Sequence, residues 1–191
     1  QCGESELKSL IGVPIHSIFQ RLLNSEDNGL INRGIILYRE RFSETGIFEN
    51  KVYPGITELL IALYQRSYRL CIVTLKNKDD AEKIARHFSF DGLIQGIFGP
   101  NVDEYPEKKT PLIKSVMTDF KLAPDETKMI GDRQEDVVSG KLNGTRTIGV
   151  TYGYGSEAEI IGAAPDYICR RPDEIQGAIE AASLLNLDID A

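Results

Sequence analysis

The chain is poor in the residues that usually mark metal clusters, disulfide frameworks and redox sites. Its 191 residues include no Trp, two Met, two His and three Cys. The cysteines, Cys2, Cys71 and Cys169, are odd in number and widely spaced, and two of them lie in apolar runs. This pattern favours buried, reduced thiols in a cytoplasmic protein over a disulfide framework or a metal cluster.

Long apolar runs and basic stretches are also missing. No apolar run approaches the roughly 20 residues of a membrane-spanning helix. The formal net charge is −7, so we do not expect a large basic surface for nucleic acid. The first residues, Gln1–Glu4, carry neither a signal-peptide pattern nor an initiator Met, and we expect the natural chain to begin further upstream. We predict no membrane or nucleic-acid partner, and the sequence leaves the oligomeric state unknown.

What is present divides the chain in two. Residues 1–52 contain helical patterns and no strand-like run, which predicts a small all-helical subdomain. Pro14 is expected to open one of its helices, and Ser25 to cap the next. Along that second helix, apolar residues recur at helical spacing, at Ile31, Ile35, Tyr38 and Phe42.

Residues 53–191 alternate between helical and strand-like segments, beginning after Tyr53-Pro54-Gly55. Four short apolar runs read as strands: Leu70–Val73, Ile97–Phe98, Thr147–Val150 and Tyr167–Cys169. A further run, Met129-Ile130, ends at Gly131-Asp132. Helical patterns predict helices over Ile56–Arg66 and Asp79–Phe88, one capped by Thr110, a short one that contains Asp136, and a last one from about Pro172. The fold class is therefore α/β, a Rossmann-like parallel sheet with helices on both faces plus the small helical subdomain.

Polar residues follow the predicted strands at three places: Thr74, the pair Lys108-Lys109, and Asp132 with Asp136. Because parallel strands bring their carboxyl ends to one edge, these side chains are expected to meet. A hydroxyl, an ammonium group and carboxylates suit a phosphate held beside Mg²⁺. Each residue also has an ordinary structural explanation: a strand-end Thr, solvated lysines, a helix N-cap at Asp132, and a first-turn carboxylate at Asp136.

At this point the sequence resembles the haloacid-dehalogenase-like phosphohydrolases, in particular their phosphoglycolate-phosphatase-like branch with an inserted helical cap. Tyr53–Gly55 resembles the return from cap to core, and Cys71–Lys76 the second family motif. Met129–Asp136 is similar to the fourth motif, and Val150–Ser156 to the loop after it. The resemblance covers nearly the whole chain, and the fourth motif with its loop is the specific part.

The resemblance implies roles for these residues. Asp132 would coordinate Mg²⁺, and Asp136 would support the metal site through water or a hydrogen bond. Thr74, with backbone N–H groups such as that of Leu75, would hold phosphate oxygens. Lys109 fits the third-motif lysine, which links the nucleophile and the phosphate, and Lys108 is the alternative. The implied activity is Mg²⁺-dependent hydrolysis of a small phosphorylated metabolite of the phosphoglycolate type; a nucleotide or pyrophosphate is the alternative substrate.

One departure from the family is large. Its first motif, a strand ending in Asp-x-Asp-Gly-Thr that supplies the nucleophile, is absent from these 191 residues. Asp188 and Asp190 have the spacing, but they follow a helix at the end of the chain. In the family that strand is central, between those ending at Thr74 and Asp132, so the sheet is expected to be divided. We therefore predict that this chain alone has little or no phosphatase activity.

Two other classes of function stay open. A non-catalytic relative could bind phosphate or a partner without forming the aspartyl-phosphate intermediate, and the sequence upstream of Gln1 would discriminate it from the enzyme. A receiver-like signalling domain also gathers carboxylates at strand ends. The helical segment before the sheet and the order of Lys109 before Asp132 argue against that class.

Overall fold

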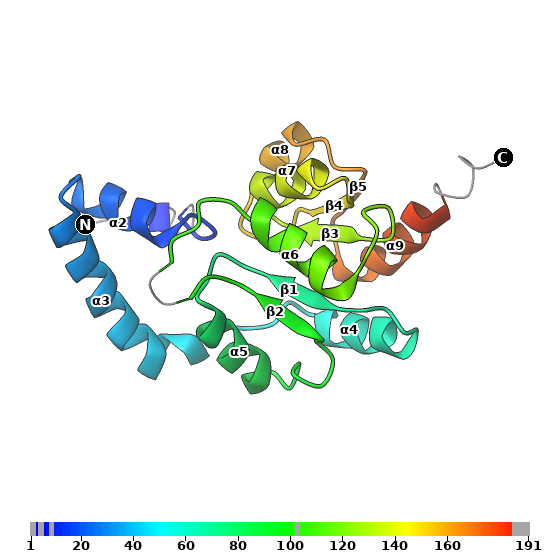
Figure 1. Cartoon of the computed structure of the whole chain (residues 1–191), viewed down its shortest axis with the longest axis horizontal. Helices are drawn as coiled ribbons and strands as arrows, with labels where there is room; N and C mark the ends of the chain where they lie inside the picture. The colour runs from blue at the N-terminus through cyan, green and yellow to red at the C-terminus, as the bar shows by residue number, and fades with distance from the viewer. Residues whose placement is uncertain (1–2, 4–5, 8–9, 102–103, 185–191) are drawn as a thin grey trace.

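The structure, a computed structural model, describes residues 3, 6–7, 10–101 and 104–184 (Figure 1). Helices and short strands follow one another in the order α2 (Ile15–Leu23), α3 (Asn28–Glu44), η1 (Gly46–Phe48), α4 (Ile56–Gln65), β1 (Cys71–Val73), α5 (Lys78–His87), β2 (Gly96–Phe98), α6 (Thr110–Phe120), β3 (Lys128–Gly131), α7 (Gln134–Leu142), β4 (Arg146–Val150), α8 (Glu157–Gly162), β5 (Tyr167–Cys169), η2 (Pro172–Glu174) and α9 (Ile175–Leu184). The predicted α/β class is confirmed, since the paired strands are all parallel and alternate with helices. No helix in the described ranges is long and apolar enough to cross a membrane.

The strands form two separate ladders. β1 pairs with β2, and β4 pairs with β3 on one side and β5 on the other. In Figure 1 the strands follow one another as β5, β4, β3, β1 and β2 from top to bottom. Within the described residues no hydrogen-bonded ladder joins β1 to β3. The expected division of the sheet between the strands that lead to Thr74 and Asp132 is therefore confirmed.

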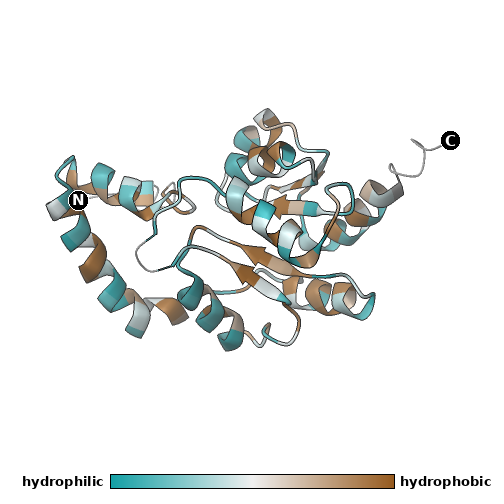
Figure 2. Ribbon diagram, viewed as in Figure 1, coloured by the Kyte–Doolittle hydropathy of each residue, from teal (hydrophilic) through white to brown (hydrophobic). Residues whose placement is uncertain are grey.

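Helices connect and cover the two ladders. Helix α6 contacts β1 and β2 on one side and α7 on the other, so it bridges the division. Figure 2 shows that the strands are mostly apolar and that the helices carry both apolar and hydrophilic residues. A cluster of buried apolar residues joins α4, β4, β5 and α9 through Leu63, Ile148, Val150, Cys169, Ile175, Ala178 and Ile179. Burial of this apolar surface stabilises the packing of β4 and β5 against α4 and α9.

Residues 10–52 form the N-terminal helical segment, which contains α2, α3 and η1 and no strand among its described residues. Ile31 and Ile35 of α3 are buried at 0% and 1% exposure, as their helical spacing predicted. The segment stands beside the core and contacts it through η1 and α5. The boundary at residue 52 stays a prediction.

Two predicted helix caps are wrong. The N-cap of α3 is Asp27, not Ser25, because the Asp27 carboxylate accepts the N–H groups of Gly29 and Leu30. The Ser25 hydroxyl accepts the N–H of Asp27 instead, at 3.1 Å. Thr110 is already the first residue of α6, and its hydroxyl bonds the Ser139 hydroxyl at 2.9 Å.

Strands β4 and β5 are joined by a side chain as well as by their ladder. The Asp166 carboxylate accepts both the N–H and the hydroxyl of Thr147, at 2.7 and 2.8 Å. Arg146 lies 3.3 Å from the same carboxylate. Burial raises the pKa of Asp166, but the bonds from Thr147 and Arg146 outweigh it and hold that pKa below its usual range.

Some predictions concern residues outside the described ranges. The helix expected over Glu4–Ile11 falls partly outside the described residues, and so do Cys2, Asp188 and Asp190. Of the two cysteines that are described, Cys71 is half-buried and Cys169 buried, and both are free thiols.

Candidate active site

Lys109 and Asp136 form the most buried ion pair near the strand ends. Lys109 lies at the N-cap of α6, and Asp136 in the first turn of α7. The Lys109 Nζ donates to Asp136 Oδ1 at 2.6 Å, with the two side chains 20% and 2% exposed. Asp136 Oδ2 accepts the N–H of Arg133 at 3.1 Å. The predicted lysine and carboxylate thus meet, although 27 positions separate them in the sequence.

A second carboxylate fixes the backbone around this pair. Glu135 Oε1 accepts the N–H of Lys109 at 3.1 Å and the hydroxyl of Ser139 at 2.7 Å. The Ser139 hydroxyl in turn bonds Thr110. Since these bonds connect the start of α6 to the first turns of α7, the position of the Lys109 ammonium group is determined by both helices.

Asp132 follows β3 and is enclosed by the loop after β4. Its Oδ2 accepts the N–H of Tyr154 at 2.7 Å. A Cβ added to Gly153 would lie 2.2 Å from Asp132 Cβ, and one added to Gly155 would lie 1.9 Å from the Asp132 carbonyl oxygen. This loop therefore requires glycine at both positions to approach the aspartate.

Asp132 does not serve as the N-cap of α7, which was its ordinary structural explanation. Arg133 occupies the N-cap position, and the carboxylate that accepts its N–H belongs to Asp136. Asp136 therefore has a helix-capping role in addition to its ion pair. The Asp132 carboxylate, with Oδ2 bonded to the loop, presents Oδ1 as the oxygen for another ligand.

Thr74 lies on the other ladder. Its N–H donates to the Phe98 carbonyl at 2.9 Å, which extends the β1–β2 pairing by one residue. Its Oγ1 accepts the N–H of Lys76 at 3.0 Å and closes a turn that contains Leu75. Because Oγ1 is the acceptor in that bond, its own hydrogen stays available to a phosphate oxygen. In the described part of the chain, no hydrogen bond joins Thr74 to Lys109 or Asp132.

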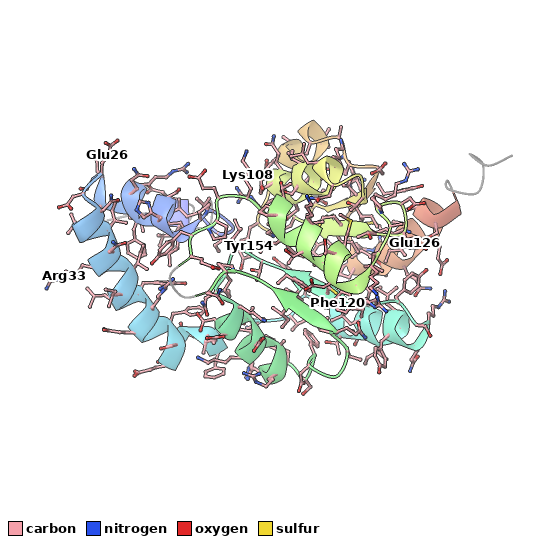
Figure 3. All side chains as sticks on the ribbon, viewed as in Figure 1. Glu26, Arg33, Lys108, Phe120, Glu126 and Tyr154 are labelled. Atoms are coloured by element: carbon pink, nitrogen blue, oxygen red, sulfur yellow. The ribbon has the colours of Figure 1, made fainter. Side chains whose placement is uncertain are left out.

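Lys108, the alternative to Lys109, is exposed. Figure 3 shows it on the loop that reaches α6 and shows Tyr154 between the N-terminal helical segment and the core. Only Lys109 of the two lysines forms an ion pair among the residues described. The geometry therefore favours Lys109 as the lysine of the site.

The carboxylates of the site suit Mg²⁺ in part. Mg²⁺ keeps several water ligands and is usually held by one or two carboxylates plus the oxygens of a bound phosphate. Asp132 is a suitable ligand, whereas Asp136 is already bonded to Lys109 and to the N–H of Arg133. No cluster of three or more His, Cys, Asp or Glu able to hold a metal is found among the described residues. The metal roles of Asp132 and Asp136 stay predictions.

Two tyrosines lie next to Asp132. The rings of Tyr53 and Tyr152 meet edge to face with their centroids 5.3 Å apart. Burial raises the pKa of Tyr152 to about 12, assisted by Cys169, Asp132 and Tyr53. Burial also raises the pKa of Tyr53, assisted by Tyr154 and Asp132. Both phenols therefore remain protonated at neutral pH and add no negative charge to the site.

Arg133 and Glu159 were not identified from the sequence. Arg133 Nε bonds Glu159 Oε1 at 2.9 Å, and its Nη1 donates to the Ile11 carbonyl at the same distance. The residue after Asp132 thus holds the start of the N-terminal helical segment. Only its place directly after a predicted metal ligand could have marked it.

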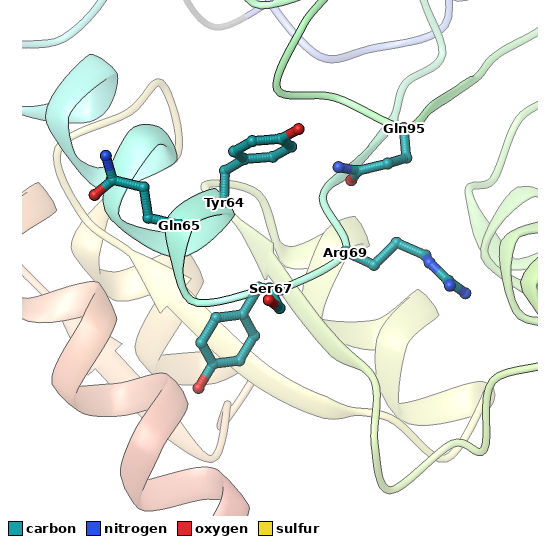
Figure 4. A pocket seen from close by; sticks show the side chains of 6 residues that line it. Tyr64, Gln65, Ser67, Arg69 and Gln95 are labelled. Carbon is teal, nitrogen blue, oxygen red and sulfur yellow. The ribbon is translucent and has the colours of Figure 1, made fainter.

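A hollow of about 510 Å³ lies elsewhere, beyond α4 and before β1, at the amino end of that strand. Figure 4 shows the polar side chains that line it, among them Gln65, Arg69 and Gln95. Thr74 lies at the opposite end of β1, so this hollow is separate from the candidate active site.

Comparisons with known proteins identify the family of this chain. Residues 1–150 match the model of a family described as haloacid dehalogenase-like hydrolase. The chain is 38% identical over 165 residues to a 5'-nucleotidase of Pseudomonas aeruginosa, a match that covers 86% of this chain and 74% of that protein. It is 30% identical over 135 residues to a phosphoglycolate phosphatase of Vibrio vulnificus, covering 69% of this chain and 58% of that protein. The crystal structure of a predicted phosphatase from Clostridium acetobutylicum has a TM-score of 0.86 at 33% identity, covering 93% of this chain and 82% of that one. This chain thus spans less than two thirds of the Vibrio protein.

Proposed function

Because this chain belongs to the haloacid dehalogenase-like hydrolase family, we propose that its protein is a Mg²⁺-dependent phosphatase of small phosphorylated metabolites. The relatives of this chain include a phosphoglycolate phosphatase and a 5'-nucleotidase. The observation that best supports the proposal is the buried Lys109–Asp136 pair, which holds an ammonium group next to the turn that bears Asp132.

In this proposal the residues of the chain hold the phosphate. Lys109 has three N–H donors, of which Asp136 takes one, so the remaining ones can donate to a phosphate oxygen. The Thr74 hydroxyl donates to another oxygen, and the backbone of Leu75 lies in the same turn. Asp132 would hold Mg²⁺, which when bound offsets the negative charge of the phosphate oxygens.

The covalent step needs a nucleophilic aspartate, which the family carries in its first motif. That motif is absent from these 191 residues. An aspartate carboxylate attacks phosphorus, the alcohol leaves with a proton from a general acid, and water then hydrolyses the acyl phosphate. No Asp-x-Asp-Gly sequence occurs in this chain. The division between β1 and β3 supports the proposal that a strand carrying such an aspartate belongs there.

The test compares two forms of the protein. The 191-residue chain and the protein at its full natural length would be purified, and phosphate release from phosphoglycolate, nucleoside monophosphates and pyrophosphate measured with and without Mg²⁺. We expect turnover by the longer form alone, with Mg²⁺. Asp132→Asn should lower turnover by about a hundredfold or more, whereas Asp125→Asn, in an exposed turn at the other end of β3, should leave it unchanged.

If the Asp132→Asn variant keeps normal turnover, Asp132 is not a metal ligand in the reaction. Full turnover by the 191-residue chain would show that another carboxylate in this sequence is the nucleophile. Phosphate binding without turnover by the full-length protein would instead favour a non-catalytic relative.

A further inference from the structure

A turn of residues 10–13, the 10–13 turn, lies just before α2 and is bonded to a side chain of the core. The Val13 N–H closes the turn by donating to the Leu10 carbonyl at 3.1 Å. Arg133 Nη1 donates to the Ile11 carbonyl at 2.9 Å, although 122 positions separate the two residues. Leu10 is 6% exposed, so the turn is packed as well as bonded. The N-terminal helical segment therefore begins at a contact with Arg133.

Gly12 shows that the 10–13 turn is fitted to this arginine. A Cβ added to Gly12 would lie 3.2 Å from Arg133 Cγ and 3.6 Å from its Cδ. The φ of Gly12 is +87°, a conformation that residues with a Cβ rarely adopt. The backbone of the turn and the close approach of the arginine side chain thus both require glycine at this position.

Glu159 of α8 orients the Arg133 side chain. Glu159 Oε1 accepts a hydrogen bond from Arg133 Nε at 2.9 Å and another from the Gln134 N–H at 2.8 Å. The Arg133 and Glu159 side chains are 22% and 23% exposed, so salt screens the pair less than it screens a surface pair. Because the guanidinium group is planar and rigid, the bond at Nε fixes the direction in which Nη1 points. Glu159 thereby directs Nη1 at the Ile11 carbonyl.

The backbone of Arg133 belongs to the turn that bears Asp132. The Arg133 N–H donates to Asp136 Oδ2 at 3.1 Å, and Asp132 Oδ2 accepts the Tyr154 N–H at 2.7 Å. Two adjacent residues therefore have different partners: Asp132 binds the loop after β4, and Arg133 binds the 10–13 turn. If the 10–13 turn moves away from the core, it breaks a bond to the residue next to Asp132.

We propose that Arg133 and Glu159 are positioning residues, which hold the 10–13 turn against the turn that bears Asp132. Through this contact they determine where the N-terminal helical segment begins relative to the candidate active site. Neither residue touches the phosphate: Glu159 acts through Arg133, and Arg133 acts through the 10–13 turn. The inference rests on the proposed phosphatase function and assigns it two further residues. The competing explanation is that the ion pair only stabilises the packing of α8 against α7.

Hydrogen exchange of single amides tests the contact without turnover. In the protein at its full natural length, Arg133→Met should speed exchange of the Val13 N–H about tenfold or more, the effect of losing one hydrogen bond from a charged donor. Glu159→Met should act in the same direction. The amides of β4, which no bond of this pair reaches in the described residues, should keep their rates.

Gly12→Ala is a second variant that leaves the Arg133–Glu159 pair in place. Its new methyl group meets the Arg133 side chain and strains the backbone of the 10–13 turn. We expect faster exchange at Val13 in this variant too, with the stability of α7 and α8 unchanged. It keeps the inference testable if Arg133→Met fails to fold.

Turnover tests whether the contact serves the reaction. Phosphate release by the full-length protein would be measured with the best substrate of the panel described above. We expect Arg133→Met and Glu159→Met each to lower kcat/KM about tenfold, again the effect of one charged hydrogen bond. Because Glu159 acts through Arg133, the double variant should lose no more than Arg133→Met alone. Independent losses would instead multiply.

A matched control pair lies on the same helix. Arg170 Nη2 bonds Glu157 Oε1 at 2.8 Å, so this ion pair joins α8 to the residue after β5 instead of to the 10–13 turn. Arg170→Met and Glu157→Met should leave both Val13 exchange and kcat/KM unchanged.

The outcomes separate this inference from the function on which it rests. Unchanged exchange at Val13 in Arg133→Met, or a rise that the β4 amides share, would overturn the inference and favour the purely stabilising explanation. Selectively faster exchange at Val13 with the kcat/KM of the parent would also overturn it and leave the phosphatase intact. Absence of turnover by the parent protein would reject the phosphatase. Selective exchange at Val13 would then retain the contact and remove its role in that reaction.

Discussion

The Lys109 ammonium nitrogen lies 2.6 Å from Asp136 Oδ1 and joins the start of α6 to the first turn of α7. The carboxylate is 2% exposed and the ammonium group 20%, so the pair is largely removed from water. A buried carboxylate is costly without a partner. The lysine therefore stabilises the fold at the same place where it is proposed to bind phosphate.

Lys109→Met should destabilise the protein by about 3 kcal/mol, because it leaves the Asp136 carboxylate buried and unpaired. Urea unfolding at pH 7 measures the change. Lys108→Met is the matched control: its side chain is exposed, and the loss should stay below about 0.5 kcal/mol. Similar losses in the two variants would mean that the ion pair contributes no stability.

Asp27→Ala should cost about 1 kcal/mol through loss of the α3 N-cap. Ser25→Ala should cost less than half as much, because its hydroxyl bonds only the N–H of Asp27. Thermal unfolding of the two variants beside the parent chain gives the comparison. A larger loss of stability in Ser25→Ala than in Asp27→Ala would show that Ser25 is the N-cap, as the sequence analysis predicted.

Gly155→Ala should displace the loop after β4 from Asp132, because its new methyl group would overlap the Asp132 carbonyl oxygen. We expect a loss of about 1–3 kcal/mol and weaker Mg²⁺-dependent turnover in the full-length protein. Gly177→Ala in α9 enters open space and should stabilise by about 0.5–1 kcal/mol. An unaffected Gly155→Ala variant would show that the loop does not need its close approach to Asp132.

Asp166→Asn should destabilise the β4–β5 pair by roughly 1–2 kcal/mol at pH 7, since Thr147 and Arg146 bond the charged form. The folded pKa of Asp166 lies below its unfolded value of about 3.9, so its stabilisation is present above that pH. It is lost as the pH falls through the folded pKa. Unfolding free energies of parent and variant should therefore differ at pH 7 and converge as the pH falls below the folded pKa of Asp166. A constant difference over that range would contradict this assignment.

Elements with a strong local signal could be predicted from the sequence. Buried parallel strands read as continuous apolar runs, and Cys71–Val73 and Tyr167–Cys169 are strands as expected. Helix α8 was missed because it has only six residues and begins with Glu157-Ala158-Glu159, too short for a helical apolar repeat. The cap at Ser25 was misplaced because Asp27, two residues later, accepts the N–H groups at the start of α3. The cap at Thr110 was misplaced because its hydroxyl bonds the Ser139 hydroxyl of α7.

The candidate site was predictable where side-chain type and topology agree. Lys109 and Asp136 were expected at one edge of the sheet, and they form a pair. The bond between Asp132 and the N–H of Tyr154 could not be predicted, because almost every residue has a backbone N–H and the residue type does not indicate which one donates. The contact of Arg133 with the Ile11 carbonyl depends on how the N-terminal helical segment sits on the core, which no local pattern encodes.

Because the sheet is divided, no hydrogen-bonded ladder determines the distance between Thr74 and Asp132 in the described residues. Neighbouring strands lie about 4.8 Å apart, so one strand inserted between β1 and β3 would hold the two residues' ladders about 10 Å apart. Without it, packing of α6 against β1 and β2 on one side and against α7 on the other is a constraint in the described residues. An intervening strand would therefore determine the size of phosphate group that fits between the hydroxyl and the carboxylate, in addition to any reactive group it carried.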